Sequence, residues 1–345
     1  MPRLLFGKNK NFENNGNDKP KNKHRSSIRI GKLLFDFSVV LAIFSIGYYM
    51  GRERMTPFIN TVHEYKIGIY EGNSPLELNP MGNKNPVMTA SMVTDVKADF
   101  VADPFIFHRD SIWYLFFEIL ERTQNKGIIG LAVSEDLKNW KYDQVVLEEP
   151  FHLSYPMVFE YQEKMYMIPE SGENYTVSIY QALNFPYDWV KVEDLVKGNY
   201  VDPTVFEHDG HWYMFAGERY DILHLYHADD LFGDWKAHPK SPLRVNDLIN
   251  SRPCGRVVRD DEGRLLRFAM NNEPTYGWDV RAYIVTELSP ESYSEEEYYR
   301  NPILYGTGKG WNSVRMHHID AHQFEGRWVA AVDGVGFWRT LKFSF

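Results

Sequence analysis

Short apolar strands alternate with polar turns from about residue 65 to the end of the chain. Four segments share one pattern, in which a turn residue and a proline are followed by an apolar strand, a polar turn and a second, aromatic strand. The prolines of this pattern are Pro104, Pro156, Pro203 and Pro253, spaced by 52, 47 and 50 residues. A propeller blade of four strands takes about 40–50 residues. The spacing therefore predicts an all-β chain built as a β-propeller, with each proline at the start of a strand, where it removes no ladder hydrogen bond.

The same pattern predicts five blades in a closed ring. A fifth copy, residues 318–329, lacks the proline, and the chain runs out of strands near Asp333. The strand that this last blade lacks is present at the other end of the repeats, in residues 67–70. We expect this N-terminal strand to pair with the last blade, because closure removes exposed sheet edges. The alternative is an open β-sandwich.

One apolar segment, residues 33–51, precedes the repeats. A bilayer span needs roughly 20 mostly apolar residues, and a positively charged flank stays in the cytoplasm. No small-residue cleavage site follows, so we expect a retained transmembrane helix with the propeller extracytoplasmic or lumenal. The alternative is a buried core helix. The predicted domains are a disordered, basic cytoplasmic arm (1–32), the anchor (33–51), a linker (52–64) and the propeller (65–345).

Charge is distributed unevenly along the chain. Residues 1–32 contain nine Lys or Arg and two acidic residues, a net charge of +7, whereas the whole chain carries −9 and the remainder therefore −16. A nucleic-acid partner needs a cationic surface for its phosphates, so the acidic body argues against nucleic acid. The chain has a single cysteine, Cys254, which excludes an intrachain disulfide.

Five short runs in the repeat region resemble a known family. They are Ala98–Pro104, Pro150–Pro156, Tyr166–Ser171, Leu225–Asp229 and Arg252–Val257. Together they resemble the N-terminal domain of glucosamine inositolphosphorylceramide transferase and related bacterial proteins, over roughly residues 65–334. The Asp-Pro start of the first repeat also resembles the arabinanase, levansucrase and invertase superfamily of five-bladed propellers. The resemblance implies a glycosyl hydrolase-like fold, and it says less about activity, because one fold hosts many functions.

The innermost strands of a propeller line its central channel, so equivalent positions converge at one mouth. Those positions are occupied here by Asp103, Tyr155, Asp202, a residue near Arg252, and His318. Five different side chains at one structural position indicate a binding site rather than a repeated structural ring. The alternative is a polar channel filled with water.

Glycoside hydrolysis uses two carboxyl groups, one as general acid and one as base or nucleophile. The superfamily resemblance implies that Asp103 is the base or nucleophile, with Asp202 as a further catalytic candidate. For the acid we expect Glu170, which lies in the Pro-Glu-Ser run of the resemblance, ahead of Glu118 and Glu218 at or beside the same repeat position. The alternative is that each glutamate is an ordinary surface or turn residue.

Other polar side chains of the repeats are candidates for substrate contact. Arginine suits anionic sugars and phosphates, but a structural salt bridge explains it as well. His152 reaches the mouth or is a buried, hydrogen-bonded histidine. The residues expected to contact the substrate are His152, Tyr155, Glu118, Glu218, Arg252, Arg256, His318 and Asp320.

The run Met316–His322 is the densest cluster of metal-ligand types. Residues two apart on a strand share a face, so His318, Asp320 and His322 could hold a cation, since imidazole and carboxylate are both ligands. The superfamily resemblance makes calcium at the propeller axis the candidate. The alternative is a polar channel wall, and no cofactor is required for the expected chemistry.

Two classes of function follow from these features. The first is a membrane-anchored, glycoside hydrolase-like propeller that acts on or binds a glycan or glycolipid at its axial mouth. The second is a non-catalytic sugar-binding or scaffold propeller that serves glycan or glycolipid assembly beside a glycosyltransferase. In both, the expected partners are a carbohydrate or glycolipid and a membrane, and not nucleic acid.

Overall fold

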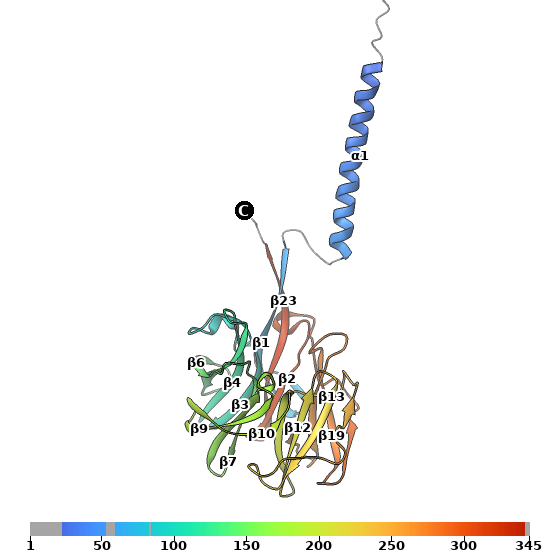
Figure 1. Cartoon of the computed structure of the whole chain (residues 1–345). Coiled ribbons are helices and arrows are strands. Elements are labelled where there is room, and N and C mark those ends of the chain that lie inside the picture. Colours follow the sequence, from blue (N-terminus) through green and yellow to red (C-terminus); the bar gives the residue numbers. More distant parts are fainter. Residues whose placement is uncertain (1–22, 53–58, 83, 342–345) are drawn as a thin grey trace, which may run out of the picture. The chain divides into compact units, whose positions relative to one another are not determined.

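The computed structural model describes residues 23–52, 59–82 and 84–341 (Figure 1). The chain divides into two units, one formed by residues 1–60 and 339–345 and the other by residues 61–338. The second unit contains five antiparallel sheets. The five-bladed, all-β propeller predicted from the repeat spacing is therefore confirmed.

The first two blades are regular four-stranded meanders. In each, the chain runs from the innermost to the outermost strand and alternates direction at tight turns. The strands of blade one are β3 (Ala98–Arg109), β4 (Ile112–Glu121), β5 (Lys126–Ser134) and β6 (Lys141–Leu147). Those of blade two are β7 (Ser154–Tyr161), β8 (Lys164–Glu170), β9 (Thr176–Asn184) and β10 (Asp188–Lys197).

Blades three and four keep this order but have shorter inner or outer strands. Blade three comprises β11 (Tyr200–His208), β12 (His211–Glu218), β13 (Ile222–Ala228), β14 (Lys236–Ala237) and β15 (Arg244–Val245), the last two both paired with β13. Blade four comprises β16 (Arg252–Pro253), β17 (Val258–Arg259), β18 (Leu265–Asn271), β19 (Asp279–Leu288), β20 (Tyr293–Glu297) and β21 (Leu304–Tyr305). Short 3₁₀ turns lie at Ala90–Met92, Gly172–Asn174 and Gly310–Asn312.

The N-terminal strand completes the fifth blade. Its sheet has the order β22 (Ile319–Phe324), β23 (Arg327–Leu341), β1 (Ile59–Ser74) and β2 (Glu77–Pro80). Residues 67–70, predicted to close the ring, lie within β1, which Figure 1 shows beside β23. Inner strands β3, β7, β11 and β16 contact one another in turn, and β22 contacts β3. The Ile319 N–H donates to the Cys254 carbonyl at 2.9 Å, which joins blades four and five.

Aromatic and aliphatic side chains fill the wedges between neighbouring sheets. Phe116 of blade one, for example, packs in one buried cluster with Met167 and Trp189 of blade two. Such interdigitated apolar faces stabilise the sheet packing, because each sheet buries both of its faces against its neighbours.

The first unit contains helix α1 (Lys23–Arg52). Several of its large apolar side chains are exposed, among them Leu34, Phe37 and Phe44. In the described part of the chain, no helix combines the length and the apolar character needed to cross a membrane. The transmembrane span predicted for residues 33–51 is therefore not confirmed.

The predicted arm and linker fall partly on residues outside the described part of the chain. Residues 1–22 of the arm and 53–58 of the linker lie outside it. The last ten residues of the predicted arm, 23–32, belong to α1, and residues 59–64 of the predicted linker belong to β1.

Candidate functional site

A repeated backbone irregularity places one residue of each of the first three blades at the axis. Asp103, Tyr155 and Asp202 have φ values of 50°, 49° and 50°, in the left-handed region that non-glycine residues seldom adopt. Each lies where the register of the inner strand shifts, so each is a bulge that redirects its side chain. The predicted equivalence of the three positions is confirmed, but the prolines that follow them lie inside the strands, at the bulges, and not at strand starts.

Side chains from the first four blades surround a cavity of about 570 Å³ at this position. Its wall combines carboxyl groups with a guanidinium, an imidazole and aromatic rings, the mixture that polar ligands such as sugars require. The principal lining residues are Asp103, Glu118, His152, Glu170, Arg252, Tyr220 and Tyr276.

A larger cavity, of about 670 Å³, lies elsewhere and is lined in part by Glu71, Asp136 and Arg327. Its acidic groups are solvated or engaged locally. Glu71 pairs with Arg327 at 3.3 Å, and backbone N–H groups of Lys138 and Asn139 hold the pKa of Asp136 at about 2. Carboxyl groups with strongly shifted pKa values mark functional sites more often than carboxylates that form ion pairs at the surface. The axial cavity is therefore the candidate site.

Burial raises the pKa of all three carboxyl groups in the axial cavity. It raises the pKa of Asp103 to about 7, with a contribution from the Asp202 and Asp333 carboxylates and opposition from His317 and Arg252. Burial, with the neighbouring acids, raises the pKa values of Glu118 and Glu170 well above the usual range. Like charges this close cannot all ionise, so the cavity contains both proton donors and acceptors near neutral pH.

Arg252 pairs with two acids on one side of the cavity. Its guanidinium ion-pairs with Asp202, with Nη2 3.3 Å from Asp202 Oδ1, and lies 3.4 Å from Glu170 Oε2. It also lies over the ring of Tyr276, 5.2 Å from the centroid. Asp202 is fully buried and does not line the cavity. The predicted catalytic Asp202 is thus placed as the partner of Arg252.

His152 faces Glu118 in the wall of the same cavity. Its Nδ1 accepts the Gly127 N–H at 3.0 Å, so Nε2 carries the proton and lies 3.4 Å from Glu118 Oε1. Burial lowers the pKa of His152, so the imidazole beside Glu118 is neutral. His152 lies at the mouth, the first of its two predicted positions.

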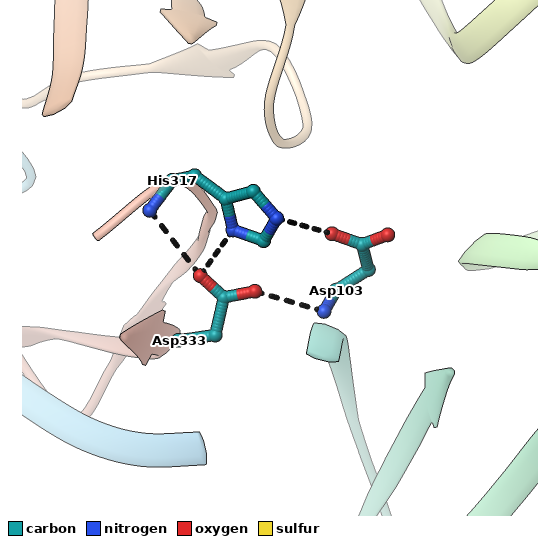
Figure 2. Close-up of side chains that lie close together, drawn as sticks. All are labelled: Asp103, His317 and Asp333. Atoms are coloured by element: carbon teal, nitrogen blue, oxygen red, sulfur yellow. Dashed lines mark hydrogen bonds and ion pairs between the residues drawn. The ribbon is translucent and has the colours of Figure 1, made fainter. Parts of the chain in front are cut away.

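Two further residues, His317 and Asp333, support Asp103 from blade five (Figure 2). His317 Nδ1 donates to Asp333 Oδ1 at 2.6 Å, and His317 Nε2 lies 3.7 Å from Asp103 Oδ1. Asp333 Oδ2 accepts the backbone N–H of Asp103 at 3.0 Å. The prediction omitted both residues as site residues, although an acid within the apolar run Ala331–Val335 is a signal in the sequence.

Asp103, His317 and Asp333 are also the group whose possible metal-ligand atoms all lie within 4.8 Å of one another among the described residues. Both oxygens of Asp333 and Nδ1 of His317 already form hydrogen bonds. Within this group of three, only His317 Nε2 and the Asp103 carboxylate remain for a cation, two of the three or four protein ligands of a zinc site. The arrangement is that of a hydrogen-bonded support for Asp103.

The metal-ligand set predicted from His318, Asp320 and His322 is not brought together. Asp320 Oδ1 accepts from Arg256 Nε at 2.6 Å, and its Oδ2 lies 2.9 Å from His322 Nε2 and accepts the Ile106 N–H at 2.8 Å. Despite burial, Arg256 holds the pKa of Asp320 well below its usual range. A carboxylate saturated in this way, beside a guanidinium, is a poor cation ligand.

Five of the predicted substrate contacts lie outside the cavity wall. Arg256 and Asp320 pair with each other, and Tyr155 is buried, with its hydroxyl bonded to Thr204 and to the Gly255 N–H. His318 is buried against Phe105 and Tyr155. The fifth contact is Glu218.

Glu218 shows why a one-residue offset matters. Ala102 pairs with Glu118 and Ser154 with Glu170, but Val201 pairs with Gly217. Glu218 is therefore one position further along, on the opposite face of the sheet. Its carboxylate bonds His224 Nε2 at 2.8 Å instead of reaching the cavity.

Comparisons with known proteins agree with this fold. A family model described as glucosamine inositolphosphorylceramide transferase 1, N-terminal, matches residues 60–335. Proteins named glucosamine inositolphosphorylceramide transferase 1 from Oryza sativa subsp. japonica and Arabidopsis thaliana are 34% and 32% identical over 78% of this chain. The chain spans about 40% of the length of these relatives.

Solved structures of lower identity share the fold. The catalytic domain of an α-L-arabinofuranosidase from Coprinopsis cinerea has a TM-score of 0.52 at 12% identity, covering 78% of this chain and 97% of that one. An exo-β-1,3-galactanase from Clostridium thermocellum has a TM-score of 0.51 at 12% identity, covering 64% of this chain and 53% of that one. On the match over residues 60–335, the chain belongs to the family of the N-terminal domain of glucosamine inositolphosphorylceramide transferase 1.

Proposed function

We propose that the propeller binds the sugar of a glycan or glycolipid in its axial cavity and cleaves or transfers a glycosidic bond there. The observation that carries the proposal is the shared cavity of Asp103, Glu118 and Glu170, three carboxyl groups with raised pKa values, of which the first two are buried and Glu170 is partly buried. Glycosidic chemistry needs one carboxyl group that is protonated and another that is ionised near neutral pH. Asp103, with a pKa of about 7, is suited to the ionised role.

Glu118 is the better proton donor of the two glutamates. Glu170 lies beside the Arg252 guanidinium, which favours its ionised form, and also accepts the Asp202 N–H at 3.3 Å. Glu118 lies beside the neutral imidazole of His152. Burial and the neighbouring acids favour the protonated form of Glu118. We therefore assign the acid to Glu118, in preference to the Glu170 expected from the sequence.

Glu118→Gln is expected to slow hydrolysis of alkyl glycosides about 10²-fold, because their leaving group must be protonated. Hydrolysis of the matching 2,4-dinitrophenyl glycoside should be almost unchanged, since that leaving group departs without a proton. The measurement is initial rates over a panel of such glycoside pairs, including glucosaminides. Glu170→Gln is the matched control at the equivalent position. Equal losses on both glycosides for Glu118→Gln, or a selective loss for Glu170→Gln, would contradict the assignment.

A non-catalytic, sugar-binding role is the second candidate, and the Arg252 network favours it. Arg252 engages both Glu170 and Asp202, so two of the three carboxyl groups predicted to be catalytic serve an internal ion cluster. A propeller of this kind would present a glycan within a glycosyltransferase assembly, as the names of the relatives suggest. Binding without turnover over the whole glycoside panel would decide for this candidate.

We further propose that residues 33–51 anchor the chain in a membrane, with the N-terminus cytoplasmic and the propeller extracytoplasmic or lumenal. The exposed apolar side chains of α1 and the basic residues before it support this proposal. The full chain is expected to remain in the membrane pellet after alkaline carbonate extraction, whereas a chain in which Leu41 and Ile43 are replaced by aspartate should be released. Release of the unaltered chain by carbonate would refute the anchor.

A further inference from the structure

We propose that His317 and Asp333 are a positioning pair that fixes both the direction and the charge of Asp103, an inference that rests on the function proposed for Asp103. Asp333 lies in β23, and His317 lies two residues before the start of β22, so the pair belongs to blade five whereas Asp103 belongs to blade one. Figure 2 shows the three residues joined in one loop by hydrogen bonds from His317 and the Asp103 backbone to Asp333 and by the ion pair between His317 and Asp103.

Asp333 holds the backbone of Asp103. The bulge at Asp103 takes its N–H out of the strand ladder, and a buried N–H without a partner is costly. Asp333 Oδ2 supplies the acceptor at 3.0 Å. The left-handed conformation of Asp103, which directs its carboxylate into the cavity, is thus stabilised by a carboxylate of the neighbouring blade.

The same carboxylate fixes the imidazole of His317. Asp333 Oδ1 accepts from His317 Nδ1 at 2.6 Å and from the His317 backbone N–H at 3.3 Å. The ring stacks on Tyr65, with centroids 4.5 Å apart, and its edge meets Tyr276 at 5.4 Å. With the ring held on three sides, Nε2 is left directed at Asp103 Oδ1, 3.7 Å away.

Among the charged groups around Asp103, His317 is the one that most favours the ionised form of the Asp103 carboxyl group over its protonated form. The acids facing it are Glu118, Asp202 and Asp333, and the cation besides His317 is Arg252, already paired with Asp202 and Glu170. Burial alone would lower the pKa of His317, but Asp333 reverses this and raises it. A protonated His317 favours the carboxylate form of Asp103.

His318 provides an internal comparison. Its Nδ1 lies 3.9 Å from the same Asp103 oxygen, a distance close to that of His317 Nε2. In the described part of the chain neither of its ring nitrogens has a hydrogen-bond partner, and burial lowers its pKa to about 4. The imidazoles of His317 and His318 therefore both flank Asp103, and His317, which is hydrogen-bonded to the Asp333 carboxylate, is the one that carries the positive charge.

The test is a carboxyl ¹³C NMR titration of the full chain labelled at aspartate Cγ, with the Asp103 signal assigned by its loss in Asp103→Asn. Asp103 of the unaltered chain should titrate near pH 7. In His317→Gln its pKa should rise by about 1–3 units, the usual effect of losing a nearby opposite charge. In Asp333→Asn the change should be smaller, because that variant removes the Asp333 carboxylate, which raises the pKa of Asp103, together with the charge on His317, which lowers it. His322→Gln, which removes the imidazole beside Asp320 on the same strand, is the matched control and should leave the Asp103 titration unchanged.

An Asp103 pKa within a few tenths of a unit of the unaltered value in His317→Gln would overturn the proposal. A purely structural role would lower the thermal unfolding temperature without moving the titration, so the two readouts separate the explanations. Should Asp333→Asn fail to fold, His317→Gln decides alone, because it leaves the bond from Asp333 to the Asp103 backbone in place. The titration needs no turnover, so it decides this inference even if Asp103→Asn shows that the proposed function is wrong.

Discussion

Asp103→Asn is expected to lower glycoside turnover by about 10²–10⁴-fold while the chain still binds the glycan, since general acid–base and related proton chemistry contributes that much. Asparagine keeps the shape of the side chain and its place in the cavity but cannot ionise. The rate of the unaltered enzyme should rise as the pH passes upward through about 7, where Asp103 loses its proton. The rate should fall again at higher pH, where Glu118, the general acid with the raised pKa, loses its proton.

The measurement is initial rates on the glycoside pairs described above, with binding followed separately by calorimetry. Asp279→Asn is a matched control, because Asp279 is also buried and pairs with Asn271 outside the cavity. Turnover that survives in Asp103→Asn at the rate of the unaltered chain would remove Asp103 from the mechanism. Loss of both binding and turnover in Asp279→Asn would show that any buried aspartate produces the effect through the fold.

Arg252→Leu is expected to destabilise the propeller by about 3–5 kcal/mol, because it leaves the fully buried Asp202 without its counterion. The guanidinium joins β16 of blade four to β11 of blade three and to Glu170 of blade two, so three blades lose a common contact. The free energy of unfolding is measured from the denaturant midpoint of each variant.

Arg300→Leu is the control for this second prediction. Arg300 pairs with Glu77 on the surface, where both side chains are 59% exposed, and such pairs contribute about 0–1 kcal/mol. The double variant Arg252→Leu/Asp202→Leu should recover much of the stability, because no charge then remains buried and unpaired. Equal losses for Arg252→Leu and Arg300→Leu would contradict the account of the buried cluster.

The fold was predictable because the repeated motif recurs at an interval that matches the length of a propeller blade. Proline and its neighbours recur once in each of the first four blades, and the strand missing after Asp333 is present at residues 67–70. These features depend on main-chain pairing, which a pattern of apolar and turn residues specifies directly. The bulges that place Asp103 and Asp202 at the axis were not predictable, because the left-handed backbone at an Asp-Pro pair depends on the neighbouring blade.

The site was predictable only where the register is regular. Glu118 and Glu170 occupy equivalent positions in sequence and in space, whereas Glu218 is offset by one residue and faces away. Distant partners were the other source of error. Nothing near Asp320 in the sequence indicates that Arg256 of the neighbouring blade neutralises it, and nothing near Asp103 indicates that Asp333 holds it, 230 residues later.

A glycan array that includes glucosaminyl and inositol phosphate probes shows directly whether the axial cavity is a carbohydrate site. We expect the full chain to retain a defined class of glycan, and we expect Tyr276→Ala, which removes an aromatic wall of the cavity, to lose that glycan while the chain stays folded. Glu325→Ala, at the larger cavity, should bind as the unaltered chain does. No retained glycan, or identical retention by the unaltered chain and Tyr276→Ala, would contradict the account.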